Sequence, residues 1–293
     1  MKTIDLHQVD AFTDKIFGGN PAGVVTNANG LSDEEMAHIA REMNLSETVF
    51  VSRPTMAKAD FQLRWFTPAA EVDFCGHATI GALYQLARLK MYGLGEAGQQ
   101  LVRVETKIGI LNMWSTTKLD NIIASFTTPV ATMVEYHLQG EGFAAAFGIP
   151  VQAMLPNAKV MLNTALSDII IPIASPEILE GLSFDFALIR ERFRDERIVA
   201  FGLLAINDKE EFEVRGLAPL VGVDEDPFTG RLQAELVATA KYNGLIGQSK
   251  NDVISLQGHF MGRPGKAHVS VGADGVTKVS GSGAHVFSTK MDF

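Results

Sequence analysis

The sequence predicts an α/β fold of two pseudo-symmetric halves, each a rolled, barrel-like β-sheet around a central apolar helix. Three observations support this prediction. Strand-like and helix-like segments alternate along all 293 residues. Two stretches, one from each half, resemble each other. Each of these stretches contains a helix that is apolar on nearly all sides, and such a helix must be enclosed by the rest of the protein.

The first elements are strands and one amphipathic helix. The opening stretch MKTIDLHQVDAF alternates polar and apolar residues, which is typical of a strand. A helix is predicted from Ser32 to Asn44, because Ser32 and Glu35 form a capping box and apolar residues follow at helical spacing. Thr48–Val51 then has the composition of a strand. We therefore expect Glu47 at a helix-to-strand junction, where its side chain is held rigidly and reaches a cleft.

An internal repeat links the two halves. Residues 61–93 (FQLRWFTPAAEVDFCGHATIGALYQLARLKMYG) align without a gap to residues 212–244 (FEVRGLAPLVGVDEDPFTGRLQAELVATAKYNG). Eight of the 33 aligned positions are identical, including Arg64 with Arg215, whereas chance would give roughly two. Each copy predicts a strand, a Pro turn, an acidic loop and a helix closed by a C′ glycine, Gly93 or Gly244. We interpret the repeat as a duplication and expect the two central helices, 78–87 and 232–240, to point their N-termini at one cleft.

Composition excludes several classes of protein. An apolar content of 46% and a charged content of 20% are typical of a globular protein with a large core. The net charge of −9 argues against a nucleic-acid or anionic-membrane partner. One cysteine and seven histidines without HExxH spacing predict neither a disulfide nor a metal site. No signal peptide or long apolar run is present, so we expect a cytoplasmic protein.

The expected domains are residues 1–118, with a C-terminal strand at about 282–293 packed on them, and residues 119–281. The stretch Gly93-Leu-Gly-Glu-Ala-Gly98 matches a dinucleotide-binding fingerprint, but it follows a helix and precedes a strand, the reverse of what that motif requires. We predict that it is a loop.

Cys75 is a candidate catalytic thiol, because it stands at a helix N-terminus, where a thiol pKa falls. His77 is only two residues on, and within a helix the two side chains would point to different sides. We therefore expect no thiol–imidazole pair. In the second copy the matching residue is Asp226, so a two-thiol racemase would lack its partner. The alternative is that Cys75 is a small buried residue.

Two turns and one carboxyl complete the candidate site. The free N–H groups of Gly76–His77 and of Thr229–Gly230 would bind a substrate carboxylate, unless these glycines only form tight turns. Glu47 is either solvated, as most glutamates are, or partly buried among apolar neighbours with a raised pKa suited to proton transfer.

At these residues the chain resembles the phenazine-biosynthesis isomerase (PhzF-like) family. The stretches that carry the resemblance run from one end of the chain to the other: QVDAFTDKIFGGNPAGVV (8–25), AREMNLSETVFV (40–51), RWFTPAAEVDFCGHATIGA (64–82), EDPFTG (225–230) and GRPGKAHVSV (262–271). The resemblance implies a fold similar to that of diaminopimelate epimerase, with two pseudo-symmetric halves. It also implies that the chain forms a homodimer, although no stretch of the sequence marks an interface.

The resemblance implies an activity that needs no cofactor and no metal. The family's characterised member moves a proton between carbons of a dihydro-hydroxyanthranilate, and its acid–base glutamate matches Glu47. Gly76, His77 and Asp226 match residues that hold polar groups of the substrate, and Asn20 is expected near the cleft. In the related epimerases a catalytic cysteine stands at the place of Cys75, which here would be a relic.

One departure from the family concerns the substrate. After the DP-x-TG motif the family usually has Ser-Ala-His, whereas this chain has Arg231, Leu232 and Gln233. Arg231 would either clamp a carboxylate with two hydrogen bonds or fill the space and block the usual substrate. The leading interpretation is an isomerase of a small carboxylated metabolite. The alternatives are an amino-acid racemase or epimerase that uses Cys75 with a second base, and a binding protein without turnover.

Overall fold

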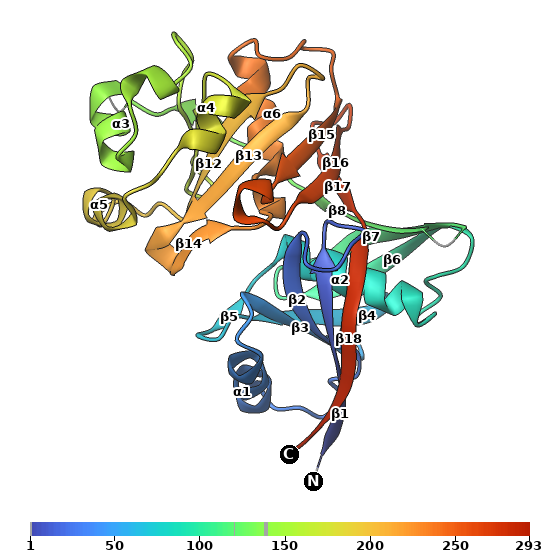
Figure 1. Ribbon diagram of the computed structural model, residues 1–293. Coiled ribbons are helices and arrows are strands. Elements are labelled where there is room, and N and C mark those ends of the chain that lie inside the picture. Colours follow the sequence, from blue (N-terminus) through green and yellow to red (C-terminus); the bar gives the residue numbers. More distant parts are fainter. Residues whose placement is uncertain (1, 120, 138–139) are drawn as a thin grey trace. The chain divides into compact units, whose positions relative to one another are not determined.

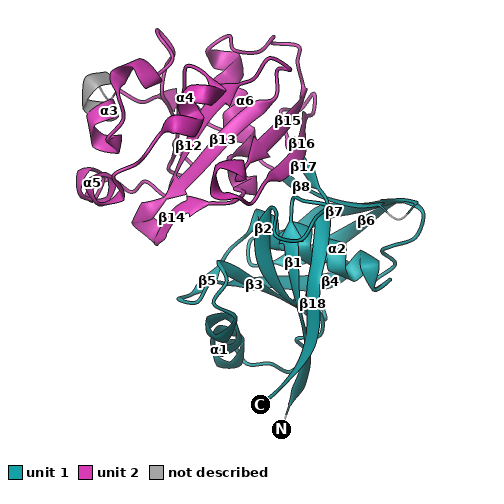
Figure 2. Cartoon of the chain, in the orientation of Figure 1, with its two compact units in different colours: residues 1–127, 278–293 teal, residues 128–277 magenta. Residues whose placement is uncertain are grey.

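The computed structural model describes residues 2–119, 121–137 and 140–293. It divides into two compact units, which Figure 2 distinguishes by colour. Unit 1 consists of residues 1–127 and 278–293, and unit 2 of residues 128–277. In the part of the chain that is described, no helix is long and apolar enough to cross a membrane.

Unit 1 is a strongly curved sheet around one helix (Figure 1). Its strands are β1 (Thr3–Ala11), β2 (Asn20–Val25), β3 (Glu47–Ser52), β4 (Phe61–Phe66), β5 (Glu71–Val72), β6 (Gly98–Thr106), β7 (Gly109–Lys118), β8 (Asn121–Thr128), β17 (Thr277–Gly281) and β18 (Gly283–Asp292). β18, β1 and β2 are antiparallel neighbours, β2 is parallel to β3, β3 is antiparallel to β4, and β4 is parallel to β6. The central helix α2 (Gly76–Arg88) contacts β1, β2, β3, β7 and β18.

Unit 2 repeats this plan with extra helices outside the sheet. Its strands are β9 (Met133–Glu135), β10 (Met161–Asn163), β11 (Asp168–Pro172), β12 (Ala200–Ile206), β13 (Phe212–Ala218), β14 (Val223–Asp226), β15 (Asp252–Gln257) and β16 (Gly265–Val271). Its helices are α3 (Gly140–Phe147), α4 (Pro176–Gly181), α5 (Phe186–Arg192) and α6 (Gln233–Tyr242). Short 3-10 turns stand at Val151–Ala153, Pro219–Val221, Gly230–Leu232 and His259–Met261. The core of this unit contains three aromatic rings that pack at steep angles to one another, those of Phe147 in α3, Phe201 in β12 and Phe193 at the end of α5.

The two units share one strand order, which supports the predicted duplication. In unit 2, β10 is antiparallel to β11, β11 parallel to β12, β12 antiparallel to β13, and β13 parallel to β15, just as β1, β2, β3, β4 and β6 pair in unit 1. Even an ion pair is repeated. Arg64 of β4 binds Glu71 with two hydrogen bonds, of 2.7 and 3.0 Å, and Arg215 of β13 binds Glu225 with two of 2.7 Å.

The central helices are enclosed, as their composition predicts. In α2 only Tyr84 and Arg88 are not buried, and most of α6 is buried as well. The burial of these apolar helices stabilises each unit, because apolar surface that is removed from water on folding makes the free energy of folding more favourable.

The predicted ends of the helices are correct in two cases and wrong in one. Helix α1 (Asp33–Met43) begins at the capping box of Ser32 and Glu35. Helix α6 ends as expected at Gly244, which has a φ of +66°. In α2, however, Gly93 is not the C′ residue. The helix ends earlier, and Lys90 adopts the left-handed conformation (φ +54°) while its N–H donates to the carbonyl of Ala87.

Candidate functional site

Glu47 is held between a helix and a sheet, as predicted. The chain leaves α1 through Asn44, which adopts the left-handed conformation, and Glu47 is the first residue of β3, where it pairs with Ala22 of the parallel strand β2. The next residues of β3 are fully buried. The carboxyl is therefore fixed at the end of a rigid strand, with 19% of its side chain exposed.

Cys75 and His77 lie in contact, which corrects the prediction that they would diverge. Cys75 is the N-cap of α2, with an extended backbone (φ −140°, ψ 120°), so the angular spacing within a helix does not apply to it. The Cys75 Sγ lies 3.5 Å from Nδ1 of His77. Cys75 is 8% exposed, which agrees with the alternative that it is a buried residue.

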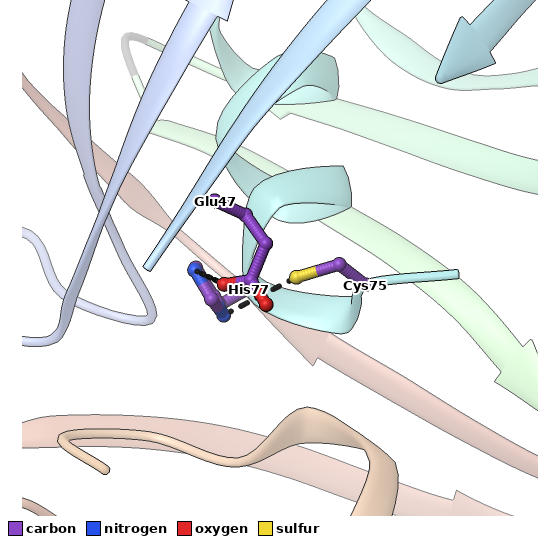
Figure 3. Close-up of side chains that lie close together, drawn as sticks. All are labelled: Glu47, Cys75 and His77. Atoms are coloured by element: carbon purple, nitrogen blue, oxygen red, sulfur yellow. Dashed lines mark hydrogen bonds and ion pairs between the residues drawn. The ribbon is translucent and has the colours of Figure 1, made fainter. Parts of the chain in front are cut away.

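The Glu47 carboxyl lies against the same imidazole (Figure 3). One carboxylate oxygen is 3.3 Å from His77 Nε2, and the hydroxyl of Ser46 is 3.2 Å from the same nitrogen. Burial raises the pKa of Glu47 above its ordinary value, although hydrogen bonds from Ser46 and Cys75 pull it in the opposite direction. A raised pKa makes the carboxylate a stronger base and keeps its acid form accessible, which suits a group that both takes and gives a proton.

Two more of the predicted site residues, Asn20 and Gly76, also lie in unit 1. Asn20 is the first residue of β2 and is 1% exposed, two positions before the partner of Glu47. Gly19 precedes it with a φ of +51°, and a Cβ there would lie 1.9 Å from the carbonyl oxygen of Ala11. This glycine is therefore required by the close approach of two backbones. Gly76 is the first residue of α2, directly before His77.

In unit 2 the DPFTG turn is tied together by its own side chains. Thr229 donates its hydroxyl to the Asp226 carboxylate at 2.5 Å, and Gln257 of β15 donates to the backbone carbonyl of Asp226 at 2.8 Å. The backbone N–H of Thr229 was expected to be free for a substrate, and this expectation is wrong, because it donates to the Gln257 side chain at 3.1 Å. Gly230 begins the 3-10 turn that leads into α6.

Arg231 is already engaged inside unit 2. Its Nη2 donates to the carboxylate of Asp168 at 2.5 Å and to the carbonyl of Leu166 at 3.0 Å. Asp168 is fully buried, whereas 35% of the Arg231 side chain is exposed. The charge of this guanidinium is balanced by Asp168, and its Nη2 is already engaged. This argues against the prediction that the same nitrogen takes part in a pair of hydrogen bonds to a substrate carboxylate.

Three residues of these clusters were not predicted from the sequence. Ser46, Gln257 and Asp168 each hold a predicted site residue in place. Ser46 could have been noticed, because it directly precedes Glu47. The other two lie 28 and 63 residues away in sequence from their partners, and no local pattern marks them. Within the described residues, Glu47, Cys75 and His77 also form a group whose side chains could hold a metal ion.

Comparison with known proteins supports the fold and the family. Residues 9–289 match the family model described as phenazine biosynthesis-like protein. A Clostridium acetobutylicum protein named an uncharacterized isomerase is 31% identical over 99% of both chains. The Escherichia coli K12 protein YddE, also named an uncharacterized isomerase, is 31% identical over 91% of this chain and 89% of its own length.

Solved structures agree on the fold. The Bacillus anthracis phenazine biosynthesis protein of the PhzF family has a TM-score of 0.87, at 24% identity over the whole of both chains. A probable proline racemase from Agrobacterium radiobacter has a TM-score of 0.64 at 10% identity, over 99% of this chain and 93% of its own. The fold of two pseudo-symmetric, epimerase-like halves is therefore confirmed. With a family model that matches nearly its whole length, this chain belongs to the phenazine biosynthesis-like protein family.

Proposed function

We propose that the chain is an isomerase that moves a proton between two carbons of a small carboxylated metabolite, without a cofactor and with Glu47 as general acid and base. The observation that carries this proposal is the Glu47 carboxyl itself. It is partly buried at the end of a rigid strand, its pKa is raised, and it lies against His77. The isomerase names of the relatives support the class of reaction.

The proposed reaction needs one group that works twice. Glu47, ionised, takes a proton from a carbon of the substrate, and the electron pair left behind shifts a neighbouring double bond. The protonated Glu47 then returns the proton to the far end of the shifted system. One C–H bond breaks, another forms and no electrons leave the substrate, so the balance needs no oxidant or reductant. A raised pKa suits both halves, because it makes the carboxylate a stronger base and keeps the acid form accessible.

The other predicted site residues are proposed to bind the substrate. In unit 1 these are Asn20, Gly76 and His77. His77 contacts Glu47 directly, so it is placed to orient the carboxyl as well. In unit 2, Asp226, Thr229 and Gly230 remain predicted contacts for polar groups, through atoms other than the Thr229 N–H. Arg231 remains a predicted contact only through donors that Asp168 and Leu166 do not use.

A second candidate function is racemisation or epimerisation by Cys75. The observation that favours it is the contact of 3.5 Å between Cys75 Sγ and His77 Nδ1, which would help the thiol to ionise. Against it, a two-base racemase needs bases on opposite faces of the substrate. Cys75 and Glu47 contact the same imidazole in the same unit, so they cannot serve as that pair.

The experiment that tests this proposal measures the exchange of the transferred proton with solvent. Wild-type chain and Glu47→Gln are incubated in D2O with a panel of small cyclic and amino-acid carboxylates, and deuterium in recovered compounds is measured by mass spectrometry. With the wild type we expect deuterium at a carbon that carried no exchangeable proton before the reaction. In Glu47→Gln we expect the rate of deuterium incorporation to fall roughly 100- to 10,000-fold, because an amide cannot accept the proton. Glu34→Gln, an exposed glutamate of α1, is the matched control.

The outcomes separate the three interpretations. Deuterium at a single inverted carbon, without a moved double bond, indicates a racemase. A compound that raises the melting temperature but exchanges no deuterium indicates a binding protein. Near wild-type turnover by Glu47→Gln would refute the proposed role of Glu47.

A further inference from the structure

Three different metal-binding side chains converge in unit 1. Cys75 is the residue directly before α2, His77 is the second residue of that helix, and Glu47 is the first residue of β3. One ligand atom from each, a sulfur, an imidazole nitrogen and a carboxylate oxygen, lies within 4.8 Å of the other two. Figure 3 shows the three side chains together, with one contact drawn from the imidazole to the carboxylate and another from the imidazole to the sulfur.

The spacing is close to what a tetrahedral cation requires. With Zn–S near 2.3 Å and Zn–N or Zn–O near 2.0 Å, neighbouring ligand atoms lie about 3.3–3.6 Å apart. The observed separations are 3.5 Å from Cys75 Sγ to His77 Nδ1 and 3.3 Å from His77 Nε2 to Glu47. These contacts use different ring nitrogens, so a rotation of the imidazole must bring one nitrogen toward both partners. One nitrogen of His77 lies within 4.8 Å of the ligand atoms of both partners, so the three atoms must also draw closer together when a cation binds.

Charge and burial also suit a divalent cation. A Cys75 thiolate and a Glu47 carboxylate together carry two negative charges, which balance those of a divalent ion in a place with little access to water. Cys75 and His77 are less than 9% exposed, and Glu47 is the most accessible of the three, so an ion can enter from its side. The mixture of soft sulfur with nitrogen and oxygen selects Zn²⁺ or Co²⁺ over Mg²⁺ or Ca²⁺.

We propose that Cys75, His77 and Glu47 form a binding site for a thiophilic divalent cation such as Zn²⁺. Three protein ligands leave a fourth position for water, as in open zinc sites. The sequence predicted no metal site, because its histidines and its cysteine lack a known ligand spacing along the chain. The site arises only when the start of a strand meets the start of a helix. One consequence rests on the proposed function: a cation on the Glu47 carboxylate stops it from accepting a proton, so Zn²⁺ would inhibit the enzyme.

The experiment measures the binding of Co²⁺ directly, so its result does not depend on enzymatic activity. Tag-free chain is freed of metal with a chelator and titrated with Co²⁺, whose bond to a thiolate gives a charge-transfer absorption band in the near ultraviolet. We expect the band to saturate at one equivalent. Because Cys75 is the chain's only cysteine, the band identifies that ligand. Zn²⁺ should displace Co²⁺ and remove the band.

Variants decide whether the other two residues are ligands. Glu47→Gln and His77→Ala should each weaken Co²⁺ binding at least tenfold. His259→Ala is the matched control, since His259 also lies against a carboxylate, 3.0 Å from Glu213, and should bind Co²⁺ like the wild type. Circular dichroism of each variant checks that it is folded, and the isosteric Glu47→Gln keeps the test decisive if His77→Ala unfolds. The proposal is overturned if the wild type gives no band, or if a folded Glu47→Gln binds Co²⁺ as tightly as the wild type.

Discussion

Glu235→Gln is expected to flatten the pH dependence of stability. Glu235 of α6 and Asp168 of β11 are both fully buried, and their carboxyl groups interact. Glu235 also accepts a hydrogen bond of 2.9 Å from Asn163, and Asp168 is paired with Arg231. Burial and then the charge of Asp168 raise the pKa of Glu235 to about 9, from an ordinary 4.5. The pair therefore holds one proton at neutral pH.

Proton linkage decides whether the free energy of unfolding rises or falls with pH. Between about pH 4.5 and 9 the folded chain keeps this proton, whereas the unfolded chain has released it. The stability that Glu235 contributes is therefore fully present below its unfolded pKa and is lost as the pH rises toward 9. One bound proton corresponds to a slope of at most about 1.4 kcal/mol per pH unit, or about 3 kcal/mol between pH 6 and 8.

Glutamine imitates the protonated state, because its amide donates toward Asp168 while its oxygen still accepts from Asn163. We expect Glu235→Gln to be no less stable than the wild type at pH 8 and to lose most of the slope. The assay is urea denaturation followed by circular dichroism from pH 5.5 to 8.5 at constant ionic strength, with the exposed Glu34→Gln as control. An unchanged slope in Glu235→Gln would refute the shared proton.

The remaining predictions concern the thiol, the repeated ion pair and the cofactor. Cys75→Ala should keep most activity on a substrate found in the deuterium screen. A loss beyond a thousandfold, about 4 kcal/mol in the transition state, would revive the racemase. Arg215→Met should cost about 3 kcal/mol in denaturation experiments, and Arg64→Met about half of that, because only Arg215 also donates to the carbonyls of Leu179 and Leu182. Equal losses would contradict this. The dialysed protein should show no visible absorption band, and a persistent flavin or pyridoxal spectrum would contradict cofactor independence.

The fold was largely predictable because its signals are local or repeated. The capping box of Ser32 and Glu35 defines the start of α1 through contacts three residues apart. The apolar composition of α2 and α6 predicts that both are enclosed, whatever surrounds them. Because the chain contains a duplication, each element predicted in one half is also expected at the matching place in the other half. The division of the chain differs in detail from the expected boundary at 118/119, because β8 pairs with β7 and so lies almost wholly in unit 1.

The geometry of the site was less predictable because it depends on backbone details and distant partners. Helical spacing separates Cys75 from His77, but an N-cap residue is outside the helix and turns its side chain back toward the first turn. The Thr229 N–H was expected to be free because helix N-termini leave such groups unpaired. Gln257 reaches it from a strand later in the chain. Such contacts follow from the folded sheet and not from any spacing in sequence.

The duplication also explains why the proposed acid–base chemistry belongs to unit 1. In unit 1 the parallel pair of strands begins with Ala22 opposite Glu47, so the carboxyl stands at the strand start with part of its surface exposed. In unit 2 the corresponding pair is Asp168 opposite Ala200, which puts the carboxyl on the other strand. There it is fully buried and held by Arg231. A proton acceptor must reach its substrate, and Asp168 cannot do so without breaking that ion pair. The two copies have thus diverged: unit 1 has a partly exposed carboxyl on β3, whereas unit 2 has Ala200 at the matching position and a buried, ion-paired carboxyl on the neighbouring strand.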